Sequence, residues 1–150
     1  MKDIDYSMAC NLPPGPWSDE PDRLEWKTAY GHHALILRNM MGALCGYVAV
    51  PPGHRVHGKH YDEVNVYVHG GLTYANHCNG RICHDVEGED NVWWLGFDCA
   101  HYCDFVPSYT ELFKRYSISY VNDNSDIVYR NIDYVRNECE LLSAQIAGME

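Results

Sequence analysis

The sequence predicts an α+β domain in which an antiparallel or mixed β-sheet is packed by one long C-terminal helix. Short segments between residues 24 and 97 alternate apolar and polar side chains with a period of two, which is typical of strands. Apolar residues within 130–147 recur at steps of three and four, which indicates a helix with one apolar face. The 150 residues, 46% of them apolar, suffice for one hydrophobic core. We therefore expect a single domain over 1–150, with an extended N-terminal arm over 1–23 and a core over 24–147.

The first half of the chain carries most of the strand patterns. Three prolines within 12–17 restrict the backbone and remove N–H donors, so we expect an extended arm that wraps the domain or a neighbouring subunit. Gly46 interrupts one apolar segment and is expected to break that strand. Strands are predicted at 24–28, 34–37, 44–50 and 64–68, with a turn at 39–42 and a loop at 51–61.

The second half contains the most hydrophobic strand and the clearest helix. Residues 92–97 predict a buried strand, 72–74 continue an earlier one, and 108–116 form a short helix. Gly148 suits the position just after the end of the last helix. The apolar stripe of that helix consists of Ile132, Val135, Cys139, Leu142 and Ile146.

The charge balance argues against one broad class of partner. The net charge is −10, from 11 basic and 21 acidic residues, whereas nucleic-acid binding depends on Lys and Arg contacts to phosphates. We therefore expect no general nucleic-acid binding. Taken singly, the basic residues near the middle of the chain are expected to be solvated surface charges, but a basic pocket for one small anion stays open: Arg38, Arg55, Lys59 and Arg81.

The chain shows no sign of membrane insertion or secretion. No apolar run approaches the ~20 residues of a membrane span, and the residues after Met1 form no apolar signal segment. An odd number of cysteines, seven, fits a reducing compartment in which most thiols are buried. We expect a cytoplasmic protein without membrane association.

Two polar segments are the candidates for catalytic chemistry. His69 ends a predicted strand beside two glycines, and a histidine in such a place acts as a general acid or base or packs as a hydrogen-bonded core residue. Asp98 and Asp104 bracket His101 directly after the strand at 92–97. A carboxylate orients an imidazole for acid–base catalysis, and the same residues could hold a divalent metal. The bland alternative is that Asp98 caps a turn and His101 is an interior histidine.

A third segment raises the question of zinc. His-Cys and Cys-His pairs flank the turn at Asn79 and Gly80, and zinc prefers nitrogen and sulfur ligands. The cysteine spacings lack the paired Cys-x2-Cys pattern of strong zinc sites, so reduced thiols in a hairpin are the favoured interpretation and any cofactor stays unknown. The candidate ligands are His77, Cys78, Cys83, His84, Cys99 and Cys103.

A ligand pocket is expected around these segments. Glycine without a Cβ lets a ligand approach the backbone, and basic side chains hold phosphates. Alternation places Trp93 and Trp94 on opposite faces of a strand, so that one of them packs in the core while the other stacks on a base or packs under the helix or the arm. The expected ligand-binding residues are His54, Arg55, Lys59, Gly70, Gly71, Trp93 and Trp94.

Several motifs together resemble a family of small proteins found mostly in phages and prophages. They are Gly-Tyr-Val at 46–48, Pro-Gly-His at 52–54, Val-His-Gly-Gly-Leu-Thr-Tyr at 68–74, Trp-Trp-Leu-Gly-Phe-Asp-Cys-Ala-His at 93–101 with Asp104, and residues 129–135. The resemblance implies shared residues at His54, His69, Asp98, His101 and Asp104. Many members have glycine where Cys103 stands, which weakens the zinc interpretation. The resemblance also implies a role in host takeover or counter-defence.

Three functions remain open from the sequence. The first is a homo-oligomeric module that binds and sequesters a nucleotide-like immune signalling molecule. The second is a phosphodiesterase-type hydrolase that cleaves such a nucleotide with His69, His101, Asp98 and Asp104. The third is an acidic inhibitor that covers a basic surface of a host protein. Motifs of Walker-type NTPases, zincins and α/β-hydrolases are absent from the sequence.

Overall fold

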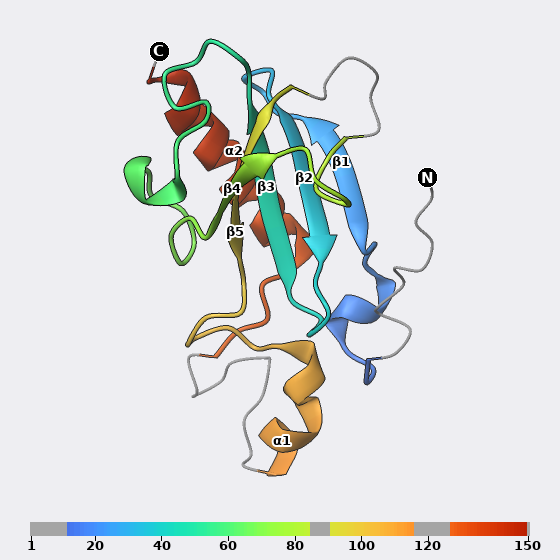
Figure 1. Ribbon diagram of the computed structural model, residues 1–150. Helices are drawn as coiled ribbons and strands as arrows, with labels where there is room; N and C mark the ends of the chain where they lie inside the picture. Colours follow the sequence, from blue (N-terminus) through green and yellow to red (C-terminus); the bar gives the residue numbers. More distant parts are fainter. Residues whose placement is uncertain (1–11, 85–90, 116–126, 150) are drawn as a thin grey trace.

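A five-stranded antiparallel sheet with one long helix across a face forms the body of the protein (Figure 1). The computed structural model describes residues 12–84, 91–115 and 127–149. The sheet has the order β1-β2-β3-β5-β4, and every neighbouring pair is antiparallel. The predicted α+β class is thus confirmed, in its antiparallel form. The elements are β1 (Arg23–Lys27), β2 (His33–Arg38), β3 (Leu44–Val50), β4 (Tyr74–His77), β5 (Trp93–Asp98), α1 (Thr110–Arg115) and α2 (Ile132–Ala147).

The helix α2 buries its apolar stripe against one face of the sheet. Val135, Cys139, Leu142 and Ile146 are all fully buried, as the stripe predicted. These residues belong to the larger of the two clusters that pack on the sheet. Burying a large apolar side chain contributes about 1.5–3 kcal/mol to stability. The predicted break at Gly46 is wrong, because β3 runs without interruption from Leu44 to Val50. Glycine serves a different purpose here, since a Cβ at Gly46 would lie 2.8 Å from the Cys139 sulfur.

The opposite face of the sheet is also apolar. Leu35, Tyr47 and Trp94 are buried in a second cluster, against which Ile82 packs from the segment after β4. Alternation does place the two tryptophans on opposite faces. Trp93 is half-buried beside the ring of His77, and its indole N–H donates to the Lys59 carbonyl at 3.0 Å. Trp94 is fully buried, so it offers no open stacking surface.

The segment 64–68 is extended but is not a strand, which corrects the prediction. Its alternation is real, since Val64 is buried while Tyr67 faces solvent. The backbone of Tyr67 pairs with a side chain instead of a neighbouring strand. Its N–H donates to Gln145 Oε1 at 2.7 Å, and its carbonyl accepts from Gln145 Nε2 at 2.8 Å. One amide of α2 therefore satisfies the groups that a strand partner would otherwise take.

The described part of the N-terminal arm packs on its own chain. It includes the 3-10 helix η2 (Pro16–Asp19), and Trp17 is fully buried against Phe105 and Tyr129. Arg38 is fully buried as well, so its assignment as a surface charge is wrong. Its guanidinium donates to Asp22 at 2.8 Å and to the Tyr129 hydroxyl at 3.0 Å. Within the described residues, no helix has the length and apolar character needed to cross a membrane.

Candidate functional site

The structure gathers the predicted catalytic residues where β5 ends. Four segments meet there: the turn after residue 68, the turn after β5, the stretch before α2, and the first turns of α2. We call this group the Asp104 cluster. It consists of His69, Gly70, Asp98, His101, Asp104 and Arg130.

Asp104 is the centre of the cluster and is almost completely buried. Its side chain is 1% exposed and accepts hydrogen bonds from His69 Nε2, the His101 N–H and Arg130 Nε, each at 2.9 Å. Burial alone would raise the pKa of this carboxyl. The three donors outweigh burial, and the pKa of Asp104 lies below its ordinary value. Asp104 is therefore a buried carboxylate that holds its neighbours in place.

His69 has both ring nitrogens occupied. Nε2 faces Asp104, and Nδ1 lies 2.8 Å from the Tyr134 hydroxyl. A neutral ring that donates from Nε2 and accepts at Nδ1 satisfies both contacts. Its backbone N–H also donates to Glu138 Oε1 at 2.8 Å. A role as general base would require one of these bonds to break, so the geometry makes His69 a positioning residue.

His101 is the more accessible histidine of the cluster. Its side chain is 35% exposed, and Nε2 lies 3.2 Å from Asp98 Oδ1 in a geometry short of a hydrogen bond. Asp98 is itself fixed, because it accepts from Thr73 Oγ1 at 3.0 Å and from the Ala100 N–H at 3.1 Å. The imidazole lies directly against the backbone of Gly70, where a Cβ would come within 2.3 Å of the ring. His101 and Asp98 thus form the histidine–carboxylate contact of the cluster in which the imidazole is partly exposed.

Of the predicted binding residues, Gly70 belongs to the Asp104 cluster and Gly71 follows it in the chain, while the others lie outside the cluster. His54 joins the loop after β3 to the end of α2, since Nε2 donates to the Ile146 carbonyl at 2.9 Å and Nδ1 accepts from the Val56 N–H at 3.1 Å. Arg55 and Lys59 are exposed on this loop. His54 thus contacts the end of α2, whereas the Asp104 cluster contacts its beginning.

The candidate zinc ligands do not converge either. Cys78 and Cys83 form a disulfide, so the prediction of reduced thiols in this hairpin is wrong. His84 is buried and donates to the Ala34 carbonyl at 2.6 Å, while His77 lies against Trp93. Across the described ranges, no group of three or more His, Cys, Asp or Glu residues could hold a metal ion.

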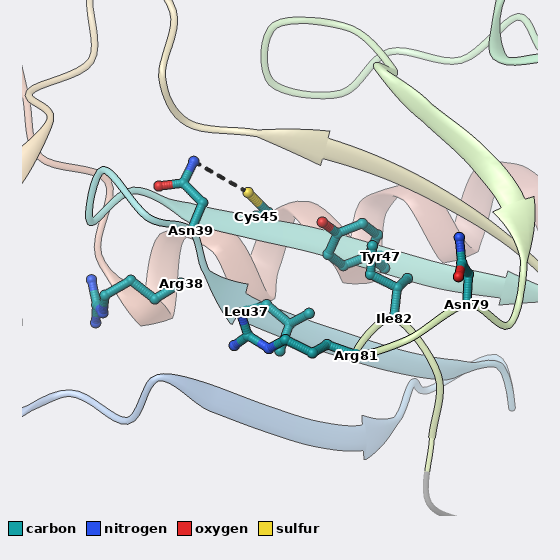
Figure 2. A pocket seen from close by; sticks show the side chains of 8 residues that line it. All are labelled: Leu37, Arg38, Asn39, Cys45, Tyr47, Asn79, Arg81 and Ile82. Carbon is teal, nitrogen blue, oxygen red and sulfur yellow. Dashed lines mark hydrogen bonds between the residues drawn. The ribbon is translucent and has the colours of Figure 1, made fainter. Parts of the chain in front are cut away.

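The structure instead reveals a pocket on the face of the sheet opposite α2. We call this cavity of about 280 Å³ the sheet pocket (Figure 2). Its floor comes from β2 and β3, and its side comes from the loop after β4. This volume lies near the lower limit of about 300 Å³ that is usual for small-molecule sites. The lining residues are Leu37, Arg38, Asn39, Cys45, Tyr47, Asn79, Arg81 and Ile82.

Polar groups are placed at defined points in the sheet pocket. The Asn39 side-chain oxygen accepts from the N–H groups of Met41 and Ala43, which leaves its amide nitrogen 3.9 Å from the Cys45 sulfur (Figure 2). Burial, and then the nearby Asp98, raises the pKa of Cys45 to about 12, while Arg81 partly opposes this shift. The thiol is therefore neutral, and the Arg81 charge reaches the pocket.

The sheet pocket and the Asp104 cluster are neighbours through β3 and β5. Cys45 lines the pocket, and Asp98 is its direct partner across the strand pair. Directly opposed residues of an antiparallel pair have their Cβ atoms about 4.5–5.5 Å apart on the same face. Asp98 thus lies beside one lining residue, although neither Asp98 nor His101 lines the sheet pocket itself.

Sequence reasoning did not identify most of the pocket residues. Cys45 and Tyr47 alternate on β3 like ordinary core residues, and nothing local marks them as lining a cavity. Arg38 and Arg81 were named among four basic residues that left a pocket for one small anion open, although each taken singly was expected to be a surface charge. Tyr134 and Arg130 were likewise missed, although both lie within the residues 129–135 of the phage-family resemblance. No protein-family model, curated protein or solved structure matches the chain.

Proposed function

We propose that this chain binds a small, anionic, nucleotide-like molecule in the sheet pocket and sequesters it unchanged. The observation that carries this proposal is the pocket itself, which combines mostly apolar walls with the guanidinium of Arg81 and the amide of Asn39. Small-molecule sites typically have this composition, in which a few polar groups orient a ligand held by apolar contacts.

The chemistry of the lining favours a planar ring that carries a negative charge. The Tyr47 and Leu37 side chains offer apolar surface to a base, and Arg81 can pair with a phosphate oxygen. The chain as a whole carries a net charge of −10 and therefore repels anions. The positive charge of Arg81 makes the sheet pocket a local exception to this repulsion. Such a ligand would be the kind of immune signal that the phage-family resemblance implies.

The test is a depletion assay with two matched arginine variants. Purified protein is incubated with cyclic and linear nucleotides, and the free and heat-released fractions are identified by HPLC with mass detection. We expect a nucleotide that is depleted before heating and returned intact afterwards. Arg81→Ala should weaken its binding by about 10–100-fold, the equivalent of losing one charge-assisted hydrogen bond.

Arg55→Ala is the control, because it removes the same charge from an exposed loop outside the pocket. If Arg55→Ala weakens binding while Arg81→Ala does not, the ligand occupies the site that the sequence predicted, and the sheet pocket is the wrong location. If no nucleotide is depleted, the proposal that the chain binds these compounds is rejected. The third function, an acidic inhibitor of a host protein, is then favoured.

A second candidate function is hydrolysis of the same ligand, and the position of Asp98 directly across the strand pair from the pocket residue Cys45 favours it. In this mechanism His101 would transfer the proton and Asp98 would orient its ring. Conversion of the nucleotide in the depletion assay would show turnover. His101→Asn should then reduce turnover by at least ~100-fold without loss of folding. His60→Asn, which alters an exposed histidine elsewhere, should leave turnover unchanged.

A further inference from the structure

The loop that closes the sheet pocket is held by the Cys78–Cys83 disulfide. Three of the lining residues, Asn79, Arg81 and Ile82, lie between these two cysteines. All the other lining residues belong to β2, β3 and the turn between them, which are fixed by the sheet. The part of the pocket that lies outside these strands and their turn is thus confined to the six residues 78–83.

We propose that the Cys78–Cys83 disulfide is a redox latch for the sheet pocket, closed when oxidised and loosened by a dithiol. This inference rests on the proposed binding function and adds its regulation. The reaction is a thiol–disulfide exchange: the dithiol gives up two electrons and two protons, the S–S bond breaks, two thiols form, and the dithiol becomes a cyclic disulfide.

Without the disulfide, the loop keeps only weak ties of its own. Asn79 and Ile82 exchange two backbone hydrogen bonds of 3.1 and 3.0 Å around Gly80, whose φ of +60° suits glycine. A two-stranded turn of this size is marginal in water by itself. Breaking the S–S bond therefore shifts the loop toward open conformations.

The loop base has a second attachment that reduction does not remove. Arg23, oriented by Glu25, donates to the Arg81 carbonyl at 2.9 Å and to the Cys83 carbonyl at 2.6 Å. The loop therefore stays anchored to β1 when the disulfide opens. This combination of one permanent and one reducible attachment gives a reversible change in the pocket without loss of the fold.

The positions of the cysteines make this disulfide the selective target of a dithiol. Cys78 and Cys83 are half-exposed, so an external thiolate can reach the bond. The thiols of Cys45, Cys99 and Cys139 are buried, and burial raises the pKa of each of them, so they do not compete as internal nucleophiles. Among the described free thiols only Cys103 is exposed.

The first test needs no ligand. Hydrogen exchange is followed at the amides of Asn79 and Ile82 with and without dithiothreitol. Reduction should accelerate their exchange by at least ~10-fold while the β3 amides keep their protection, because only the loop loses a constraint. The Cys78→Ser/Cys83→Ser double variant should show the fast rates in both conditions, and Cys103→Ser should respond like the wild type. Unchanged exchange at Ile82 after verified reduction would overturn the latch.

The second test measures binding of adenosine monophosphate and cyclic di-adenosine monophosphate in both redox states. If only the closed loop binds and the loop is closed a tenth of the time, the apparent affinity is about tenfold lower than for a loop that is always closed. We expect this loss on reduction and in the double serine variant. Equal affinity in the two states would mean that the loop does not gate the pocket. If neither nucleotide binds the oxidised protein while Ile82 exchange still responds, the proposed function fails for these probes and the latch stands.

Discussion

At Gly70 the backbone leaves no room for a side chain, and this sets the position of the His101 ring. Gly70 and Gly71 both have positive φ angles, +69° and +82°. A Cβ at Gly70 would overlap the imidazole at 2.3 Å, whereas a Cβ at Gly71 would meet nothing within 4 Å. Substitutions at the two positions can therefore be compared. A side chain at Gly71 strains only the backbone, whereas a side chain at Gly70 also displaces the His101 ring.

We expect Gly71→Ala to lose about 1–2 kcal/mol of stability from backbone strain alone. Gly70→Ala should lose the same amount and in addition move the His101 ring away from Asp98. The check is chemical denaturation together with the NMR chemical shifts of the histidine rings. Identical histidine spectra in the two variants would show that Gly70 does not set the ring position.

At the scale of elements, the close approach of α2 to the sheet depends on Gly46. A Cβ there would lie 2.5 Å from the Phe97 ring and 2.8 Å from the Cys139 sulfur. We expect Gly46→Ala to reduce the free energy of unfolding by about 1–3 kcal/mol, since the added methyl overpacks a filled core. Gly148→Ala is the control, because its Cβ would make only ordinary contacts at 3.6 Å or more. Equal stabilities of the two variants in urea denaturation would contradict this role.

The elements also show what a sequence can and cannot reveal. Alternation and short apolar runs predicted all the strands of the sheet except β4, and helical periodicity predicted α2, because burial on a given face imposes a local pattern. The short helix α1 was also predicted. The extended segment at Tyr67 has the same alternation, but it pairs with the Gln145 side chain, a contact 78 residues distant. Local pattern cannot distinguish these two kinds of partner.

The same limit applies to the candidate functional residues. His69, His101, Asp98 and Asp104 were predicted as candidates because polar residues at strand ends stand out in the sequence, and the structure places them close together. The sheet pocket was not found, because its floor and its closing loop are far apart in the chain and meet only through strand pairing. Cys45 and Arg81 have no common local pattern that would have indicated a shared cavity.

At the scale of the whole molecule, two buried charges join segments that are far apart in the chain. Arg38 links the arm at Asp22 to Tyr129, just before α2. Asp104 links the turn at His69 to the residue Arg130, again just before α2. Both networks therefore fix where the helix begins, and loss of either should weaken the packing of α2 on the sheet.

The Asp104 network gives the fold a defined sensitivity to acid. The pKa of Asp104 is lower in the folded chain than the ~3.9 of an unfolded aspartate, so the folded state favours the ionised form. This contribution to stability is complete above about pH 5, and it is lost as the pH falls through the unfolded value toward the lower folded pKa. Asp104→Asn removes the contribution and leaves Arg130 without its carboxylate.

We expect Asp104→Asn to cost about 3 kcal/mol at pH 7, as for other broken buried ion pairs. The difference between wild type and variant should shrink steadily below about pH 4, because the wild-type carboxyl then becomes neutral too. Urea denaturation from pH 7 to pH 3 measures this directly. Asp98→Asn removes the same charge from a more exposed position and should cost less than 1 kcal/mol. A wild-type advantage over Asp104→Asn that stayed constant down to pH 3 would mean that Asp104 ionises alike in both states, and its hydrogen bonds would then stabilise the fold without favouring the charged carboxylate.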